Sequence, residues 1–493
     1  MFDKFKLSSQ QILIYSLGNI ATKVAGFVLL PLFATHIPIQ DYSAVVLLEP
    51  VWQLLSALLA LSLPTALLRW LAPEHDPERQ KSLVFTVLIA QLLLLVVFNL
   101  IAWPLNHLLA ARGFYSNLHY KEYLNISFLL VSFDILNLLV LSLLRFRERP
   151  VQYVVLNLFK LTANILLNVF FLVKLDMGVA SVFLSQLVAS VLLNLLSLPF
   201  LLRNLKAVFL PGPLKEMLAY GFPLIFTTIS SIILSLGDRY VIEHFMTPTD
   251  TAIYGIGYKF GGIINMFIIQ SFQLGFLPFA FKMLSDPSAP RFFARMFTYF
   301  MVALVFPGLL LAMFSKEIVV AFTLNQPGYA AAYIVIPLIT LGFILKGSQY
   351  YFSLGLHYVK RTSHNAWIVM LSAAFSLAMN FILVPRMGIY GSAWVLVLSN
   401  LLMCVLFYFF AQKFYPIRFE WRRVALLLGL GGVFYTLSLL VSLAGPYWGL
   451  IIKVGLVLVF PIVLYYSAFF DKDEKNRINQ GLQWIKSFIS KKN

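Results

Sequence analysis

Residues 220–282 decide the fold of this chain. They read YGFPLIFTTISSIILSLGDRYVIEHF (220–245), a polar turn MTPTDTA (246–252), and IYGIGYKFGGIINMFIIQSFQLGFLPFAFK (253–282). Each apolar run is long enough to cross a bilayer, because a membrane-spanning helix needs about 20 residues. Asp238 and Arg239 lie at the end of the first run, and Lys259 lies within the second. Charges are costly in lipid, so the stretch predicts a membrane hairpin whose polar face turns inward.

The composition extends this prediction to the whole chain. Of the 493 residues, 60% are hydrophobic and 12% are charged, whereas soluble domains carry about 25% charged residues. Apolar runs recur throughout, and no polar block is large enough for a soluble catalytic domain. We therefore expect an all-α integral membrane protein. The net charge of +17 is then explained by basic cytoplasmic loops, not by binding to nucleic acid.

Motifs of soluble enzymes are missing from the sequence. It contains no phosphate-binding glycine loop, no His-Glu-x-x-His and no convincing catalytic triad. The one cysteine, Cys404, lies inside an apolar run, so neither an internal disulfide nor a cysteine-based metal site is expected. We expect no enzymatic activity, no catalytic residues, no metal site and no cofactor.

Fourteen membrane spans are predicted. They cover residues 11–36, 43–70, 82–105, 122–144, 151–173, 179–202, 216–240, 252–281, 292–314, 329–354, 365–385, 389–412, 423–443 and 448–470. With these spans, one set of alternating connections and termini holds 26 of the 37 lysines and arginines, and the other set holds six. Because positive charge gathers on the cytoplasmic side, both termini are predicted to be cytoplasmic.

An internal repeat predicts two similar halves. LPTALLR (63–69) ends the second span and LPFAFK (277–282) ends the eighth, while Met177-Gly178 and Met387-Gly388 follow the fifth and eleventh spans. The matches are six spans apart, an even number, so the copies have the same orientation. This predicts two parallel six-helix lobes with pseudo-two-fold symmetry, an architecture of transporters. Chance similarity among apolar helices is the alternative.

The predicted domains follow from this repeat. They are an N-terminal lobe (1–210), a C-terminal lobe (211–413), an extra transmembrane hairpin (414–470) and a cytoplasmic tail (471–493). The tail repeats apolar residues at helical spacing between lysines, which predicts an amphipathic helix on the membrane surface. A disordered tail is the alternative.

Polar residues at helical spacing mark four faces that should turn away from lipid, because residues three or four apart share one side of a helix. The members of these faces are Ser16, Asn19, Lys23 and Gly26; Glu49, Gln53 and Ser56; Asn157, Lys160, Asn164 and Asn168; and Lys346, Gln349 and Ser353.

Lys23 and Lys346 are the principal candidates for substrate binding. Each lies near the middle of its span, one in each half, with no acidic residue at the same depth. A lysine in a wet cavity favours an anionic substrate. Asn19, Gln349 and Lys259 are further candidates. The alternatives for the lysines are snorkelling to the interface or helix packing.

Four charged residues are candidates for ion coupling or gating. Glu49 either pairs with Lys259 across the central gap or titrates as a proton or sodium site. Asp134 either titrates or forms a structural ion pair with Lys160, which lies at a similar depth in the next span. Asp238 and Arg239 lie near the outer end of their span, where a structural or gating ion pair is expected at least as much as a substrate site.

The motifs YGFP (220–223), GDRYVIEHF (237–245) and IYGIGYKF (253–260), with LPTALLR and the Met-Gly turns, resemble the polysaccharide-export flippases. These belong to the multidrug/oligosaccharidyl-lipid/polysaccharide exporter superfamily, and the resemblance extends over essentially the whole chain. It implies two six-helix lobes around a cationic cavity lined by spans one, two, seven and eight. It also implies that undecaprenyl-diphosphate-linked oligosaccharides are flipped from the inner to the outer leaflet.

The expected function is therefore a flippase for surface polysaccharides, such as O-antigen, lipopolysaccharide or exopolysaccharide, in the bacterial inner membrane. Its expected partners are the lipid-linked oligosaccharide, membrane lipids, a polysaccharide polymerase and a chain-length protein, with no nucleic acid. An ion-coupled multidrug exporter of the same superfamily is the first alternative. A membrane glycosyltransferase or polymerase is the second, although the connection 106–121 is short and has no paired carboxylates.

Overall fold

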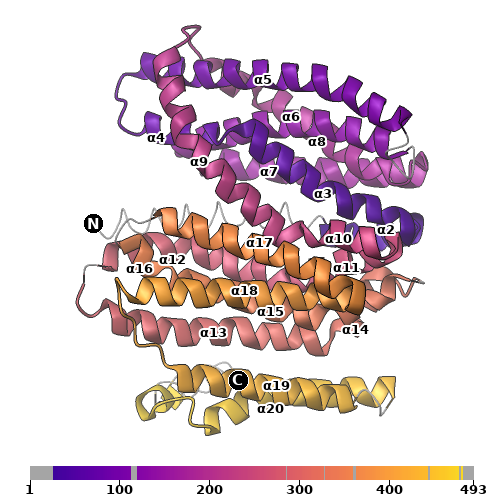
Figure 1. The fold of residues 1–493 in the computed structure, drawn as a ribbon, viewed down its shortest axis with the longest axis vertical. Coiled ribbons are helices and arrows are strands. Elements are labelled where there is room, and N and C mark those ends of the chain that lie inside the picture. Colours follow the sequence, from indigo (N-terminus) through magenta and orange to yellow (C-terminus); the bar gives the residue numbers. More distant parts are fainter. Residues whose placement is uncertain are drawn as a thin grey trace, which may run out of the picture.

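The computed structural model describes residues 26–112, 119–284, 286–326, 328–358, 362–441, 445–476 and 479–480. All regular elements in these residues are helices (Figure 1), which confirms the all-α prediction. The first part of the chain contributes α2 (Leu30–His36), α3 (Ile39–Ala60), α4 (Leu63–Leu71), α5 (Pro77–Ala111), α6 (His119–Phe146), α7 (Pro150–Val169), η1 (Phe170–Lys174) and α8 (Ala180–Arg203).

The rest of the chain continues the same pattern of long apolar helices. It contributes α9 (Pro211–Leu236), α10 (Asp238–Phe245), α11 (Pro248–Gly261), η2 (Asn265–Ile269), α12 (Gln270–Met283), α13 (Ala289–Met313), α14 (Ser315–Thr323), η3 (Tyr329–Ile334), α15 (Ile336–Phe352), α16 (Leu354–Tyr358), α17 (Thr362–Met387), α18 (Ile389–Gln412), α19 (Trp421–Val441) and α20 (Pro446–Tyr466).

The described residues contain 11 helices that are long and apolar enough to cross a membrane, or 12 if one pair bent by 40° counts as a single span. The bent pair joins α11 to the segment that follows it. α15 has only 17 residues, and residues 11–25 of the first expected span lie outside the described residues. The chain is thus a multi-pass membrane protein, and the number fourteen stays a prediction.

The second expected span is broken where α3 ends and α4 begins. Leu61 and Ser62 both adopt the left-handed conformation, with φ of 49° and 53°, which interrupts the helix because L-residues rarely continue one there. α9 crosses at this break. A Cβ at Gly221 would lie 2.4 Å from the carbonyl oxygen of Leu61, so the close crossing requires a residue without a side chain.

The helices form two bundles with a hairpin on one side (Figure 1). In the first bundle, α6 packs against α5 and α8, and α7 packs against α8; in the second, α15 packs against α13 and α18, and α17 packs against α18. Each of these helix pairs in the first bundle corresponds to the pair that lies six predicted spans later, in the second bundle. This agreement supports the two predicted lobes. Their pseudo-symmetry and the domain boundaries stay predictions. α9 runs between the bundles and packs against both α4 and α17 (Figure 1).

The bundles are closed against each other at the end where α2 meets α3 and α10 meets α11, which we call the closed end. The hydroxyl of Tyr329 donates to the carbonyl oxygen of Ile37 at 2.8 Å, and the rings of Tyr42 and Tyr329 lie 6.0 Å apart. A continuous buried apolar cluster joins α2, α3 and α8 to α11, α14 and η3 here. The opposite end carries the basic connections, such as α6–α7 and α8–α9, and we call it the basic end.

A glycine allows the tight packing at the closed end, which gives a first prediction. A Cβ at Gly255 of α11 would lie 2.4 Å from Cγ2 of Val46 on α3. Gly255→Ala is expected to destabilise this packing by about 1–3 kcal/mol, the usual cost of overpacking. The measurement is the midpoint of thermal unfolding in detergent. Val46→Ala in the same chain should recover most of the loss; a double variant no more stable than Gly255→Ala would contradict the explanation.

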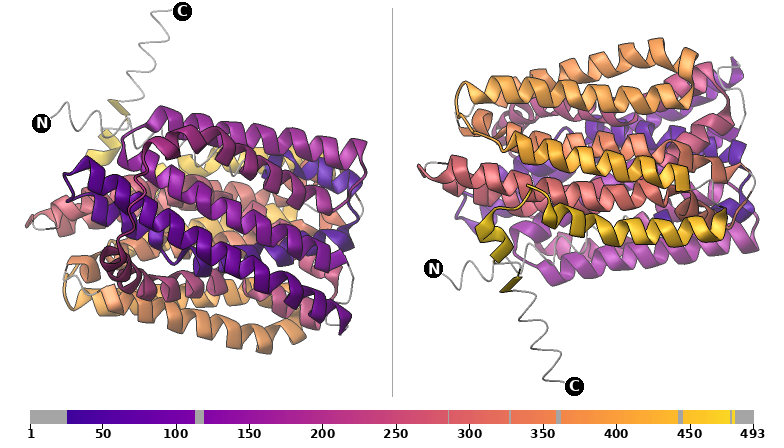
Figure 2. Two further views of the ribbon diagram at one scale, coloured as in Figure 1. Left: turned by 90° about the horizontal axis from the view of Figure 1, so that it is seen from above. Right: turned by 90° about the horizontal axis from the view of Figure 1, so that it is seen from below.

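The α19–α20 hairpin lies along the outer side of the second bundle (Figure 2) and is held at both ends by ion pairs. Near the closed end, Lys453 of α20 is buried and its Nζ lies 2.7 Å from Oε1 of Glu317 on α14. Lys453 is therefore paired inside the protein and does not extend its ammonium group to the interface. Removing one partner of a buried ion pair strongly lowers the stability of the fold, whereas replacing both partners with apolar residues often does not.

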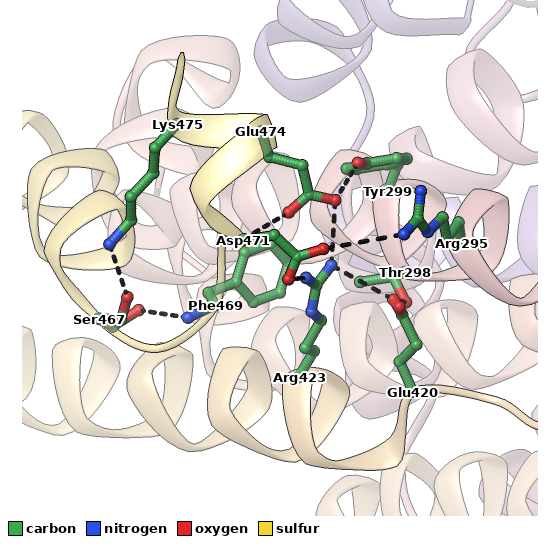
Figure 3. A network of polar contacts seen from close by, with 10 residues as sticks. All are labelled: Arg295, Thr298, Tyr299, Glu420, Arg423, Ser467, Phe469, Asp471, Glu474 and Lys475. Atoms are coloured by element: carbon green, nitrogen blue, oxygen red, sulfur yellow. Dashed lines mark hydrogen bonds and ion pairs between the residues drawn. The ribbon is translucent and has the colours of Figure 1, made fainter. Parts of the chain in front are cut away.

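At the basic end, Arg423 of α19 joins three carboxylates (Figure 3). It contacts Asp471, Glu474 at 3.1 Å and Glu420 at 3.4 Å. Burial alone would raise the pKa of the Glu474 carboxyl, but hydrogen bonds from Tyr299, the Asp471 N–H and Arg423 outweigh it and lower that pKa. The start of the tail is thus anchored to α13 and α19. Residues 481–493, most of the predicted surface helix, lie outside the described residues.

Candidate substrate cavity

A cavity of about 890 Å³ lies between the two bundles. Its described lining comes from α2, α3 and α6–α8 on one side and from α9–α12 and α15 on the other. Six members of the described lining are charged, and these are Glu49, Asp134, Lys160, Arg239, Lys259 and Lys346. With four cations and two anions, the described lining carries a formal charge of +2.

Glu49 and Arg239 form the first pair, which connects the two bundles. Nη1 of Arg239 donates to Oε2 of Glu49 at 2.8 Å and to the carbonyl oxygen of Val46 at 3.3 Å. The guanidinium also lies over the ring of Tyr258, 5.1 Å from its centroid. Arg239 is 3% exposed and Glu49 is 44% exposed, so the arginine is enclosed while the carboxylate faces the cavity.

Asp134 and Lys160 form the second pair, within the first bundle. Nζ of Lys160 lies 2.6 Å from Oδ1 of Asp134, which also accepts a hydrogen bond from Ser190 at 2.5 Å. Of the two roles expected for Asp134, this geometry favours the structural ion pair. Asp134 neutralises Lys160 and holds it at the cavity wall.

Lys259 and Lys346 supply the excess positive charge. Nζ of Lys346 donates to the hydroxyl of Ser235 at 3.2 Å and lies 5.7 Å from the centroid of the Phe343 ring. Nζ of Lys259 lies 3.0 Å from the position that a Cβ would take at Gly26. Among the described residues, no carboxylate lies within the 4.0 Å of an ion pair from either lysine. The cavity therefore presents two ammonium groups to an anion.

The other candidate residues for substrate binding or gating predicted from the sequence are not part of the described cavity lining. Lys23 and Asn19 lie outside the described residues. Gln349 does not line the cavity, and its Oε1 is buried without a hydrogen bond. Asp238 is also buried away from the cavity, where its Oδ2 accepts the hydroxyl of Tyr254 at 2.5 Å. Asp238 is thus not the partner of Arg239 that the sequence had suggested, and Glu49 pairs with Arg239, not with Lys259.

Sequence reasoning missed several members of the site. Gln186 of α8 lines the cavity. It lies four residues before Ser190 and eight before Asn194, a polar stripe that the four predicted faces do not include. Ser235, which contacts Lys346, gives no stronger signal than the other serines of α9. By contrast, all four residues of the Asn157–Asn168 stripe line the cavity. The helical spacing of polar residues therefore predicted the cavity-facing side of α7, whereas the same pattern on α8 was overlooked.

Solved structures with the same fold are membrane transporters. The lipid II flippase MurJ in an inward closed conformation matches with a TM-score of 0.74 and 14% identity, over 92% of this chain and 99% of MurJ. An inward-facing multidrug resistance MATE family transporter matches with a TM-score of 0.67 and 16% identity, over 84% of this chain and 96% of the transporter. An outward-facing one matches with a TM-score of 0.60 and 15% identity, over 85% and 96%.

Sequence comparison identifies the family. No curated protein sequence matches the chain, but the family model described as polysaccharide biosynthesis protein matches residues 8–284, which is 277 of the 493 residues. This match, together with the shared fold, confirms the resemblance to the polysaccharide-export flippases of the exporter superfamily. The chain belongs to the polysaccharide biosynthesis protein family.

Proposed function

We propose that the chain is a flippase that moves an oligosaccharide linked to a polyprenyl diphosphate across the bacterial inner membrane, for assembly of a surface polysaccharide. The observation that carries this proposal is the pair Lys259 and Lys346, which have no counter-ion among the described residues of the cavity. A diphosphate diester carries about two negative charges at neutral pH, which matches the formal +2 of the described lining. Lysine ammonium groups bind phosphate through charge-assisted hydrogen bonds.

The size and polarity of the cavity fit a head group. A volume of about 890 Å³ lies within the range of ligand sites, and the polar lining suits a diphosphate and its sugars. A long polyprenyl chain is apolar and is better solvated by lipid than by such a lining. The head group would therefore cross through the cavity while the chain stays in the membrane.

The closure of one end supports alternating access. By the positive-inside rule the basic end would lie in the cytoplasm. The bundles would then be sealed on the outer side, and the substrate would enter from the inner leaflet. Glu49–Arg239 lies between the cavity and the closed end, and it would separate when that end opens. A polymerase and a chain-length protein would act on the flipped product.

The multidrug exporter is the second candidate, and the fold shared with the MATE family transporters is the observation in its favour. A cavity with a formal +2 repels cationic drugs, because like charges close together in a partly desolvated site cost several kcal/mol. The lysine pair therefore favours the lipid-linked diphosphate.

The test replaces both lysines. Lys259→Gln/Lys346→Gln should abolish surface polysaccharide in a strain lacking the native gene. It should also weaken binding of farnesyl diphosphate to the purified full-length protein by about 100-fold or more, because a hydrogen bond to a charged group contributes about 1.5–3 kcal/mol. Lys259→Arg/Lys346→Arg should retain part of both activities.

Lys174→Gln is the matched control, since Lys174 is an exposed lysine that does not line the cavity. It should behave as the unaltered protein does. Normal polymer and normal binding of farnesyl diphosphate in the double glutamine variant, at equal protein levels, would show that the proposal is wrong. Acquired drug resistance on overexpression would instead support the exporter.

A further inference from the structure

Of the eight carboxamide side chains in the described lining, six belong to the first bundle and two, Asn265 and Gln270, to the second. The four on α7 and α8 form what we call the amide wall. It consists of Asn157, Asn164 and Asn168 of α7 and Gln186 of α8. The two unpaired lysines lie on α11 and α15. α7 and α8 pack against each other and belong to the first bundle, whereas α15 packs against α11, α13 and α18 of the second (Figure 1). The described cavity is therefore divided into a neutral polar wall and a cationic wall.

The orientation of Asn164 is fixed by its neighbours. Its Oδ1 accepts hydrogen bonds from Nδ2 of Asn168 at 2.7 Å and from the hydroxyl of Ser185 at 3.0 Å. The Nδ2 group of Asn164 therefore points away from both and donates to no described residue. Asn168 and Ser185 act as positioning residues, because they leave Asn164 to present a donor.

Asn157 and Gln186 complete the wall. Nδ2 of Asn157 donates to the carbonyl oxygen of Tyr153 at 2.8 Å, which leaves its Oδ1 as an acceptor. Gln186 makes no hydrogen bond within the described part of the chain and offers both a donor and an acceptor. Lys160 lies on the same face of α7, but Asp134 neutralises it. The wall thus presents uncharged donors and acceptors at membrane depth, where unsatisfied polar groups are costly.

We propose that the amide wall binds the saccharide of the substrate, while Lys259 and Lys346 bind its diphosphate. This inference rests on the proposed function. Sugar hydroxyl and acetamido groups both donate and accept hydrogen bonds and carry no charge, which matches carboxamides. Phosphate oxygens accept only and are charged, which matches ammonium groups. The head group spans the cavity between the two bundles, and Asn157, Asn164 and Gln186 determine which saccharide is accepted.

The test compares two probes of equal charge on the purified full-length protein: the terminal methyl ester of farnesyl diphosphate, and farnesyl diphosphate carrying one N-acetylglucosamine. The unaltered protein should bind the sugar-bearing probe more tightly. Asn164→Leu/Gln186→Met should weaken binding of the sugar-bearing probe by about tenfold, since each lost hydrogen bond is worth about 0.5–1.5 kcal/mol. It should leave binding of the methyl ester unchanged within about twofold. Thr162→Val, on the exposed face of α7, is the control and should alter neither affinity.

Lys346→Gln separates this inference from the proposed function. It should weaken both probes equally, because both carry the diphosphate. If Lys346→Gln weakens binding of neither probe, the assignment of the diphosphate to the lysines is wrong, whatever the result for the amide-wall variant. If Asn164→Leu/Gln186→Met weakens both probes equally, or neither, or if the unaltered protein binds both probes equally, the assignment of the saccharide to the amide wall is overturned.

Discussion

Glu49→Gln is expected to destabilise the protein more than Arg239→Met, although both substitutions break the same ion pair. Arg239 is 3% exposed and Glu49 is 44% exposed. Losing the carboxylate leaves an enclosed guanidinium without its partner, whereas losing the guanidinium leaves a carboxylate that the cavity can hydrate. Breaking a buried pair by removing one member costs about 3–5 kcal/mol. We expect a value near 3 kcal/mol for Glu49→Gln, because Asp238 remains as a nearby carboxylate.

The measurement is thermal unfolding of the four proteins of a double-mutant cycle, in one detergent and at one pH. Glu49→Gln/Arg239→Met should recover most of the loss, because neither member of the ion pair is left without its partner, and Asp238 keeps its hydrogen bond from Tyr254. Equal losses of stability for the two single variants would show that the difference in exposure between Glu49 and Arg239 does not determine the cost of breaking the pair. A double variant as unstable as Glu49→Gln would show that the contact contributes through something other than its charges.

Lys346→Met is expected to lower transport by about 10–100-fold without lowering stability. The ammonium group makes one hydrogen bond, to Ser235, and a contact with the Phe343 ring, so its removal relieves a desolvation cost. A phosphate contact of about 1.5–3 kcal/mol is lost at the same time. Functional sites commonly show this opposition between stability and activity. The measurements are surface polysaccharide per protein molecule and the midpoint of thermal unfolding.

Lys160→Met provides the contrast, since it makes the same chemical change on the same cavity. Lys160 is held by Asp134 at 2.6 Å, so its removal leaves a largely buried carboxylate unpaired and should lower the unfolding midpoint. If Lys346→Met is the more destabilising of the two, Lys346 has a structural role and its assignment to the substrate must be abandoned.

The sequence was sufficient for the class of fold and the family. Apolar runs of about 20 residues with few charges indicate membrane helices, because a helix is the structure in which a single segment satisfies its own backbone polar groups in lipid. Helical periodicity also found the face of α7, since Asn157, Lys160, Asn164 and Asn168 all line the cavity. Lys259 and Lys346 were recognised as cavity candidates because charge at membrane depth is rare and needs a reason.

Only the tertiary structure decided which charges are neutralised. Depth along a span suggested that Glu49 faces Lys259 and that Asp238 pairs with Arg239, but Glu49 pairs with Arg239 and Asp238 bonds Tyr254. Depth is a one-dimensional coordinate, whereas pairing depends on how α3, α10 and α11 are rotated and how closely they pack. That packing is set by contacts such as Gly255 against Val46, which involve residues far apart in the chain. In the same way, the break at Leu61 and Ser62 divides a single predicted span into two helices, α3 and α4. The sequence therefore determined a charged cavity in a membrane bundle, and the packing of the helices determined which two lysines remain free within its described part.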